Sequence, residues 1–319
     1  MPLIDMPLEK LREYKGITPC PADFDEFWDK SLEEIKAIDK NVEFVKVDYP
    51  SDIADMYDLY FTGTKGARIH ARFAKPKNIK GKAPAVINFH GLNAQAHPWY
   101  KSLGYVAHGY VYASMDSRGQ GGTSQDAGGG IGTTCSTPFI RGIDDVPENM
   151  YQRDLFLDTA IMAQIICGLD YVDEARVGCF GGSQGGGLSI ACAALVPEIK
   201  KCYSLYPYLS DYKRVWEMDL DKVAYDGLRY YFRKFDPMHK REDEIFTKLG
   251  YIDIQNLAKR VKAHVVMLTG LMDTICPPST QFAMYNKLEC KKESVIYHDY
   301  GHEDIIEVED RIFEFMKTL

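Results

Sequence analysis

The feature that most limits how this chain can fold is a serine between two glycines, Gly181-x-Ser183-x-Gly185. A short apolar run precedes it, and small and aliphatic residues at helical spacing follow it. This arrangement is typical of a nucleophile elbow, a sharp strand-to-helix turn that holds a serine at its apex. The two glycines are expected there because a Cβ two residues before or after the serine would clash with neighbouring backbone.

Two other interpretations fit the same residues. A glycine-rich loop could bind a phosphate, but that loop has the pattern Gly-x-x-x-x-Gly-Lys-Ser/Thr, and no lysine follows the glycines here. The chain could also make a tight strand-to-helix turn in which Ser183 has no catalytic role. The residues further along the chain are needed to decide.

Apolar runs alternate with helical patterns along most of the sequence. The predicted strands lie at 42–49, 56–62, 67–74, 85–91, 110–116, 202–206, 263–269 and 294–298, besides the run before Ser183. The predicted helices lie at 21–38, 146–169, after Ser183, from about 278, and at 305–316. The first three strands alternate in polarity, as antiparallel strands do, and the later ones are continuously apolar, as buried parallel strands are. We therefore predict a doubly wound α/β fold with a mostly parallel sheet and antiparallel N-terminal strands.

A serine nucleophile in the α/β-hydrolase order needs an acid and then a histidine downstream, each just after a strand. Asp273 follows the predicted strand at 263–269, and His302 follows the one at 294–298. The histidine would accept the serine proton, and the acid would fix the histidine tautomer. Ser183, Asp273 and His302 are therefore the predicted catalytic residues.

Three residues compete for the acid and base roles. His298 falls within its predicted strand and is expected to face neighbouring structure. Asp299 lies only three residues before His302, and Asp253 precedes its strand instead of following it. None of the three fits the α/β-hydrolase order as well as Asp273 and His302 do.

An oxyanion hole on this fold uses two backbone N–H groups. One is expected from Gln184, directly after the nucleophile, where the helix dipole also favours negative charge. The other is expected from Leu92, because Gly91 lets the chain turn toward the site; alternatively, His90 and Gly91 merely end a strand. Each donor would contribute about 3–4 kcal/mol to the tetrahedral intermediate.

Charge and composition limit which binding partners and which cellular compartment we expect for this protein. The net charge of −8 argues against nucleic acid or an anionic membrane as a partner, and no run approaches the length of a membrane span. The opening Met1-Pro2-Leu3-Ile4-Asp5 lacks a signal-peptide pattern, and the eight scattered cysteines indicate reduced thiols in a cytoplasmic protein. No His-x-x-x-His pattern or carboxylate cluster suggests a metal, so we expect no metal and no cofactor.

No internal repeat or linker stands out, so residues 1–319 are expected to form a single α/β-hydrolase domain with an N-terminal helical extension over about 1–40. Two insertions interrupt the alternation. The first, 117–145, is rich in glycine and is expected to be irregular. The second, about 209–257, is helical and rich in aromatic residues; it could cover the active site or equally serve packing or oligomer contacts.

Three motifs follow one another along the chain: Arg118-Gly119-Gln120, Gly181-Gly182-Ser183-Gln184-Gly185 and His302-Glu303. With the segments at 24–28, 206–211 and 273–278, they closely resemble the acetyl xylan esterase / cephalosporin-C deacetylase family, carbohydrate esterase family seven. The resemblance spans nearly the whole chain. The arginine motif together with the other two is far more specific than the elbow alone.

The resemblance implies an α/β-hydrolase fold and a cytosolic enzyme that removes acetyl groups from small sugars, xylo-oligosaccharides and cephalosporin C. It also implies a homohexamer whose active sites face an inner cavity, which favours small substrates. Ser183 would be the nucleophile, His302 the base and Asp273 the acid, with Leu92 and Gln184 as oxyanion donors. Leu92 departs from the tyrosine common in the family, which leaves the acyl preference open.

The resemblance assigns supporting roles to further residues. Arg118 is expected to anchor its loop by pairing with a carboxylate. Structural support near the site is expected from Gln120, Gly181, Gly185 and Glu303.

Two other function classes stay open at this point. One is a hydrolase of other short acyl esters or of peptides, although the chain lacks the repeats of a propeller-gated peptidase. The other is an inactive hydrolase fold that only binds a ligand or a partner. The presence of serine, acid and histidine in the required order argues against the inactive fold.

Overall fold

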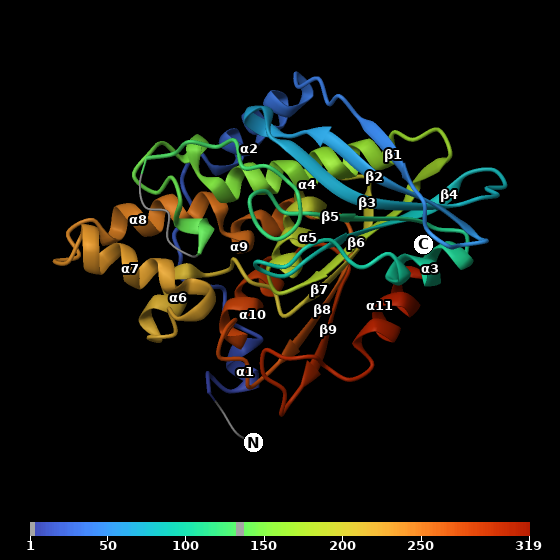
Figure 1. The fold of residues 1–319 in the computed structure, drawn as a ribbon. Helices are drawn as coiled ribbons and strands as arrows, with labels where there is room; N and C mark the ends of the chain where they lie inside the picture. Colours follow the sequence, from blue (N-terminus) through green and yellow to red (C-terminus); the bar gives the residue numbers. More distant parts are fainter. Residues whose placement is uncertain (1–3, 132–136) are drawn as a thin grey trace.

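The structure, a computed structural model, describes residues 4–131 and 137–319. Nine strands in the described part form one sheet in the order β1-β2-β3-β5-β4-β6-β7-β8-β9 (Figure 1). The strands are β1 Glu43–Val47, β2 Ala54–Thr62, β3 Arg68–Pro76, β4 Ala83–Phe89, β5 Val111–Met115, β6 Val172–Gly182, β7 Ile199–Leu205, β8 His264–Gly270 and β9 Lys292–Tyr297.

The strand directions confirm the predicted α/β-hydrolase fold. Strands β1, β2, β3 and β5 pair antiparallel in that order, and β5, β4, β6, β7, β8 and β9 pair parallel. Every residue of β4 is buried, as its continuous apolar run predicts for a strand covered on both faces.

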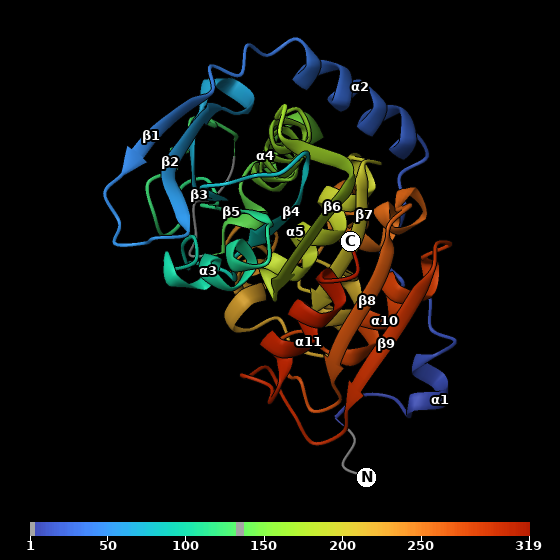
Figure 2. The same cartoon turned by 90° about the vertical axis from the view of Figure 1, so that its right-hand side faces the viewer.

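Helices cover both faces of the sheet. They are α1 Leu8–Leu11, α2 Phe24–Lys36, α3 Tyr100–Ala107, α4 Tyr151–Cys167, α5 Gln184–Leu195, α6 Tyr212–Glu217, α7 Asp226–Phe235, α8 Glu242–Leu249, α9 Ile254–Leu257, α10 Pro278–Lys287 and α11 Val308–Met316. Helices α4, α5 and α10 share one hydrophobic core, while α3 and α11, in front in Figure 2, share the other. Adjacent strand residues divide between the two cores, since Ile87 enters the first and Val86 the second.

The structure shifts several predicted bounds, among them the start of α4 and the strand end near His298. Helix α4 begins at Tyr151 and not at Val146, because a short 3₁₀ turn at Pro147–Asn149 and an extended Met150 turn the chain first. His298 was expected inside a strand and facing other structure; it lies just past the end of β9 and is exposed. Among the described residues, no helix combines the length and apolarity needed to cross a membrane.

The insertion at 209–257 folds into α6 to α9, at one side of the sheet in Figure 1. Several of its aromatic rings pack with one another and with the first insertion. Tyr212 contacts Tyr225 with ring centroids 5.9 Å apart, and it stacks on Phe139 of the first insertion at 5.2 Å. Cys135 lies outside the described residues, and the other seven cysteines are free thiols.

Two carboxyl groups are buried in this insertion, and one of them, Asp211, connects it to the N-terminal extension. Asp211 accepts hydrogen bonds from the Tyr14 hydroxyl at 2.7 Å and the Thr18 N–H at 2.8 Å. Asp253, which the sequence left as a weak candidate for the acid, caps α9 by accepting from Gln255 N–H at 3.0 Å. Burial, with the charge of Asp211 second, raises the pKa of Asp253 to about 7.

This raised pKa makes folding stability depend on pH. The folded chain keeps the Asp253 proton between about pH 4 and about pH 7, whereas the unfolded chain loses it, so stability falls as pH rises through that window. Asparagine at position 253 cannot ionise. The free energy of unfolding of Asp253→Asn should therefore rise relative to that of the parent by about 4 kcal/mol from the bottom to the top of that window. Urea unfolding of both proteins at about pH 4 and about pH 8 measures the gain. If the two proteins differ in stability by the same amount at both pH values, Asp253 is not protonated in the folded protein.

Candidate active site

Ser183 lies at the turn between β6 and α5 in a backbone conformation that residues other than glycine rarely adopt, with φ 57° and ψ −119°. Hydrogen bonds on both sides hold this strained residue. Its N–H donates to Leu205 O at 2.9 Å, and its carbonyl accepts from Gly187 N–H at 3.1 Å and Tyr208 N–H at 3.0 Å. Strain held in place by surrounding structure is what a nucleophile elbow requires.

The two glycines of the pattern lie against each other and against the end of β4. A Cβ on Gly181 would lie 2.6 Å from the carbonyl carbon of Gly185 and would also meet Phe89 O. A Cβ on Gly185 would meet Phe89 O and lie 2.7 Å from the Phe89 carbonyl carbon. The predicted close approach is therefore present, and the backbone of Phe89 is what makes glycine necessary.

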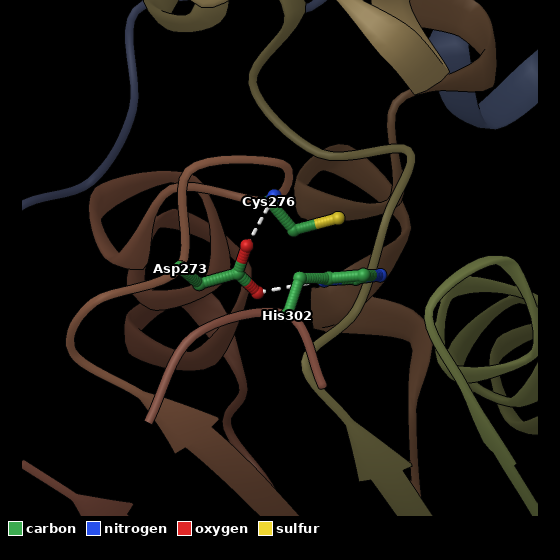
Figure 3. A group of neighbouring side chains, drawn as sticks. All are labelled: Asp273, Cys276 and His302. Carbon is green, nitrogen blue, oxygen red and sulfur yellow. Dashed lines mark hydrogen bonds and ion pairs between the residues drawn. The ribbon is translucent and has the colours of Figure 1, made fainter. Parts of the chain in front are cut away.

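The structure brings Ser183, His302 and Asp273 into one hydrogen-bonded chain. His302 Nε2 is 2.9 Å from Ser183 Oγ, and His302 Nδ1 is 2.8 Å from Asp273 Oδ2. The three residues follow β6, β9 and β8, and the carboxyl ends of these parallel strands meet at the same edge of the sheet. Figure 3 shows the Asp273 carboxylate pointing at the His302 ring.

The carboxylate of Asp273 is fully buried and held from several directions. Its Oδ1 accepts the N–H groups of Ile275 at 2.9 Å and Cys276 at 2.8 Å, which leaves Oδ2 for His302. The buried Gln281 amide donates to Cys276 O at 2.6 Å and approaches Asp273 Oδ2 at 3.4 Å. Gln281 was not predicted as a site residue from the sequence; its signal there is a polar residue early in a helix right after the acid loop.

Two more side chains adjoin the triad. The Tyr206 ring packs against the His302 ring with centroids 4.5 Å apart, and burial raises the pKa of Tyr206 to about 12, so its hydroxyl stays neutral. Burial, followed by the charge of Asp273, raises the pKa of the Cys276 thiol well above its usual range. A thiol held protonated in this way does not compete with Ser183 as a nucleophile.

The predicted oxyanion donors lie on two segments beside the elbow. Gln184 is the first residue of α5, so its N–H has no acceptor within the helix. Leu92 is half-buried in the turn after β4, where a Cβ on Gly91 would lie 3.8 Å from Gly182 O. That is an ordinary contact, so the approach of this turn does not depend on glycine at position 91, contrary to our reasoning from the sequence.

Gln120 connects these two segments through its side-chain amide. Its Oε1 accepts the N–H of Asn93 at 2.9 Å and the Nε2 of Gln184 at 3.0 Å. Its Nε2 donates to Gln184 Oε1 at 2.8 Å and to the Tyr151 hydroxyl at 3.0 Å. One side chain thus fixes the loop after β4 relative to the start of α5.

Arg118 is fully buried at a distance from the triad and pairs with carboxylates, as expected. Its Nε and Nη2 donate to the two oxygens of Asp158 at 2.6 and 2.7 Å, and Nη2 also donates to Thr64 Oγ1 at 2.8 Å. Glu303 is exposed beside His302 and accepts a hydrogen bond from the N–H of Gly301 at 2.8 Å. Its contact is therefore within the loop that carries His302.

Arg118→Met should destabilise the protein by about 3–5 kcal/mol, because it leaves Asp158 as an uncompensated buried charge. The matched control is Arg176→Met, which removes a half-exposed pair with Asp173 and should cost less than about 1 kcal/mol. Urea unfolding of the three proteins measures both values. Equal stabilities for the two variants would mean that Arg118 does not anchor its loop.

Known proteins resemble this chain over nearly its whole length. A model of the acetyl xylan esterase (AXE1) family matches residues 1–319. The crystal structure of acetyl xylan esterase 1 from Thermoanaerobacterium sp. JW/SL YS485 is 54% identical with a TM-score of 0.97, over 98% of this chain and 99% of that one. The acetyl xylan esterase from Paenibacillus sp. R4 is 34% identical with a TM-score of 0.91, also over 98% and 99%.

A curated relative is longer than this chain. The acetyl esterase Axe7A of Xylanibacter ruminicola is 29% identical over 289 residues. The match covers 88% of this chain but only 63% of that protein.

Proposed function

The chain belongs to the acetyl xylan esterase family, and from that premise we propose that it is a serine esterase that removes O-acetyl groups from small acetylated saccharides. The observation that carries the proposal is the hydrogen-bonded chain from Ser183 through His302 to Asp273, at 2.9 and 2.8 Å. The solved relatives that match almost the full chain are themselves acetyl xylan esterases. Acetylated xylose, acetylated xylo-oligosaccharides and cephalosporin C are the proposed substrates.

In the proposed mechanism, Ser183 Oγ attacks the acetyl carbonyl carbon while His302 Nε2 accepts the serine proton. The carbonyl oxygen becomes an oxyanion that the N–H groups of Leu92 and Gln184 would bind. Asp273 stabilises the resulting imidazolium and keeps the ring oriented. His302 then donates its proton to the departing sugar oxygen, which leaves an acetyl ester on Ser183.

The second half repeats these steps with water in place of the serine. His302 removes a proton from water, whose oxygen attacks the acetyl-enzyme, and Ser183 leaves with that proton as acetate is released. Every proton in the cycle passes through His302 Nε2. Apart from the substrate and one water molecule, the proposed steps use side chains and backbone groups of this chain.

Hydrolysis of p-nitrophenyl acetate, butyrate and octanoate tests the acyl preference. We expect the acetate ester to exceed the octanoate in kcat/KM by more than about tenfold, because the solved relatives that match almost the full chain are acetyl xylan esterases. Acetate release from acetylated xylose and cephalosporin C, with Ser183→Ala as control, tests the substrate class. A preference for octanoate, or cleavage of short peptides without any ester hydrolysis, would contradict the proposal.

A further inference from the structure

A thiol lies beside the triad without a part in the proposed mechanism. One ligand atom from each of Asp273, Cys276 and His302 lies within 4.8 Å of the other two. Figure 3 shows the Cys276 sulfur on the side of Asp273 toward which the His302 ring extends. Of the two ring nitrogens of His302, Nε2 faces Ser183 Oγ at 2.9 Å.

This arrangement combines the ligands that thiophilic metal ions bind. Zinc takes thiolate sulfur at about 2.3 Å and imidazole nitrogen at about 2.1 Å, so two donors of one ion lie about 3.6 Å apart at a tetrahedral angle. One ring nitrogen of His302 already lies within 4.8 Å of the Cys276 sulfur, so the two side chains are close enough to share one ion after a small movement. Asp273 is hydrogen-bonded to Nδ1 of His302. A histidine that binds a metal through one ring nitrogen usually has a carboxylate hydrogen-bonded to the other nitrogen.

We propose that Cys276 and His302 form an inhibitory site for a thiophilic divalent cation such as Zn²⁺ or Cd²⁺. The cation binds Cys276 Sγ and His302 Nε2, while Asp273 keeps its hydrogen bond to Nδ1 and orients the ring. The bond to sulfur forms as the thiol proton passes to solvent. Hard cations such as Mg²⁺ prefer oxygen ligands and do not bind here.

Binding of the cation and catalysis exclude each other. Nε2 has a single lone pair in the neutral ring, and the serine proton must be accepted by that same lone pair. A cation on Nε2 therefore removes the base without disturbing Asp273. The inhibition rests on the proposed function, whereas the binding of the cation does not.

Binding is measured first, by calorimetry of Zn²⁺ alone with Ser183→Ala protein, which keeps both ligands and has no turnover to interpret. We expect one ion per chain, and a dissociation constant raised by more than about tenfold when Cys276→Ser is added, since a hydroxyl is a poor ligand for a soft cation. Cys20→Ser, which removes an exposed thiol, is the matched control and should change nothing. Equal affinity with and without Cys276→Ser would overturn the proposal.

Inhibition is measured next on the otherwise unchanged enzyme. Zn²⁺ and Cd²⁺ should abolish p-nitrophenyl acetate hydrolysis, EDTA should restore it, and Mg²⁺ should have no effect. The inhibitory concentration for Cys276→Ser, taken relative to its own uninhibited rate, should rise by more than about tenfold. Zn²⁺ that binds through Cys276 but leaves the rate unchanged would overturn the inhibitory role. A parent protein that binds no Zn²⁺ would overturn the site itself.

Discussion

Ser183→Ala is expected to lower kcat/KM for p-nitrophenyl acetate by about 10⁶-fold while the protein stays folded. The change removes the only protein atom that forms a bond to the acetyl carbon in the proposed mechanism, so the residual rate comes from binding and the oxyanion donors alone. Alanine fills the same space as serine, so urea unfolding should give nearly the same stability. A loss of less than about a hundredfold would show that another residue is the nucleophile.

The backbone at this position offers a second comparison. Ser183 has a φ of 57°, which costs residues with a Cβ about 1 kcal/mol or more compared with glycine. Ser183→Gly should therefore be as inactive as Ser183→Ala but more stable by about 1 kcal/mol. That pair of results separates the strain at the elbow from the chemistry of the hydroxyl.

Asp273→Asn is expected to lower kcat by about 10⁴-fold. The N–H groups of Ile275 and Cys276 both need an acceptor, so the asparagine oxygen must take the place of Oδ1. The NH₂ group then faces His302 Nδ1 and forces the ring proton onto Nε2, where it blocks transfer from Ser183. Initial rates with p-nitrophenyl acetate measure the loss.

Asp299→Asn is the matched control for this variant. Asp299 is the competing acid in the same histidine loop, and it is exposed just after β9. Its replacement should leave kcat within about twofold of the parent. If Asp299→Asn loses as much activity as Asp273→Asn does, the assignment of the acid is wrong.

The fold and the three triad residues could be predicted because their signals are local. A period of two or a continuous apolar run marks each strand, and the elbow glycines fall within five consecutive residues. Once the strand order was in place, Asp273 and His302 could be identified by their position after strands. The structure brings them to the predicted place beside Ser183.

The contacts that hold the site together could not be predicted, because they join distant parts of the chain. Gln120 reaches Gln184 across 64 residues, and Asp211 reaches Tyr14 across 197. The periodicity of apolar residues indicates which face of a helix or strand is buried. It does not indicate which polar group of another segment that face contacts. The close approach of backbone to Gly185 was predicted, but not that Phe89 makes it; the position of the Cys276 thiol near His302 was not predicted either.

The measurement that tests the central claim most directly is labelling of the folded protein with a fluorophosphonate, a probe that reacts with serines activated by a neighbouring base. Intact mass spectrometry counts the adducts, and peptide mapping locates them. We predict one adduct per chain, on Ser183, and none on His302→Ala protein that remains folded. No adduct on the folded parent protein, or an adduct on a different residue, would contradict the account.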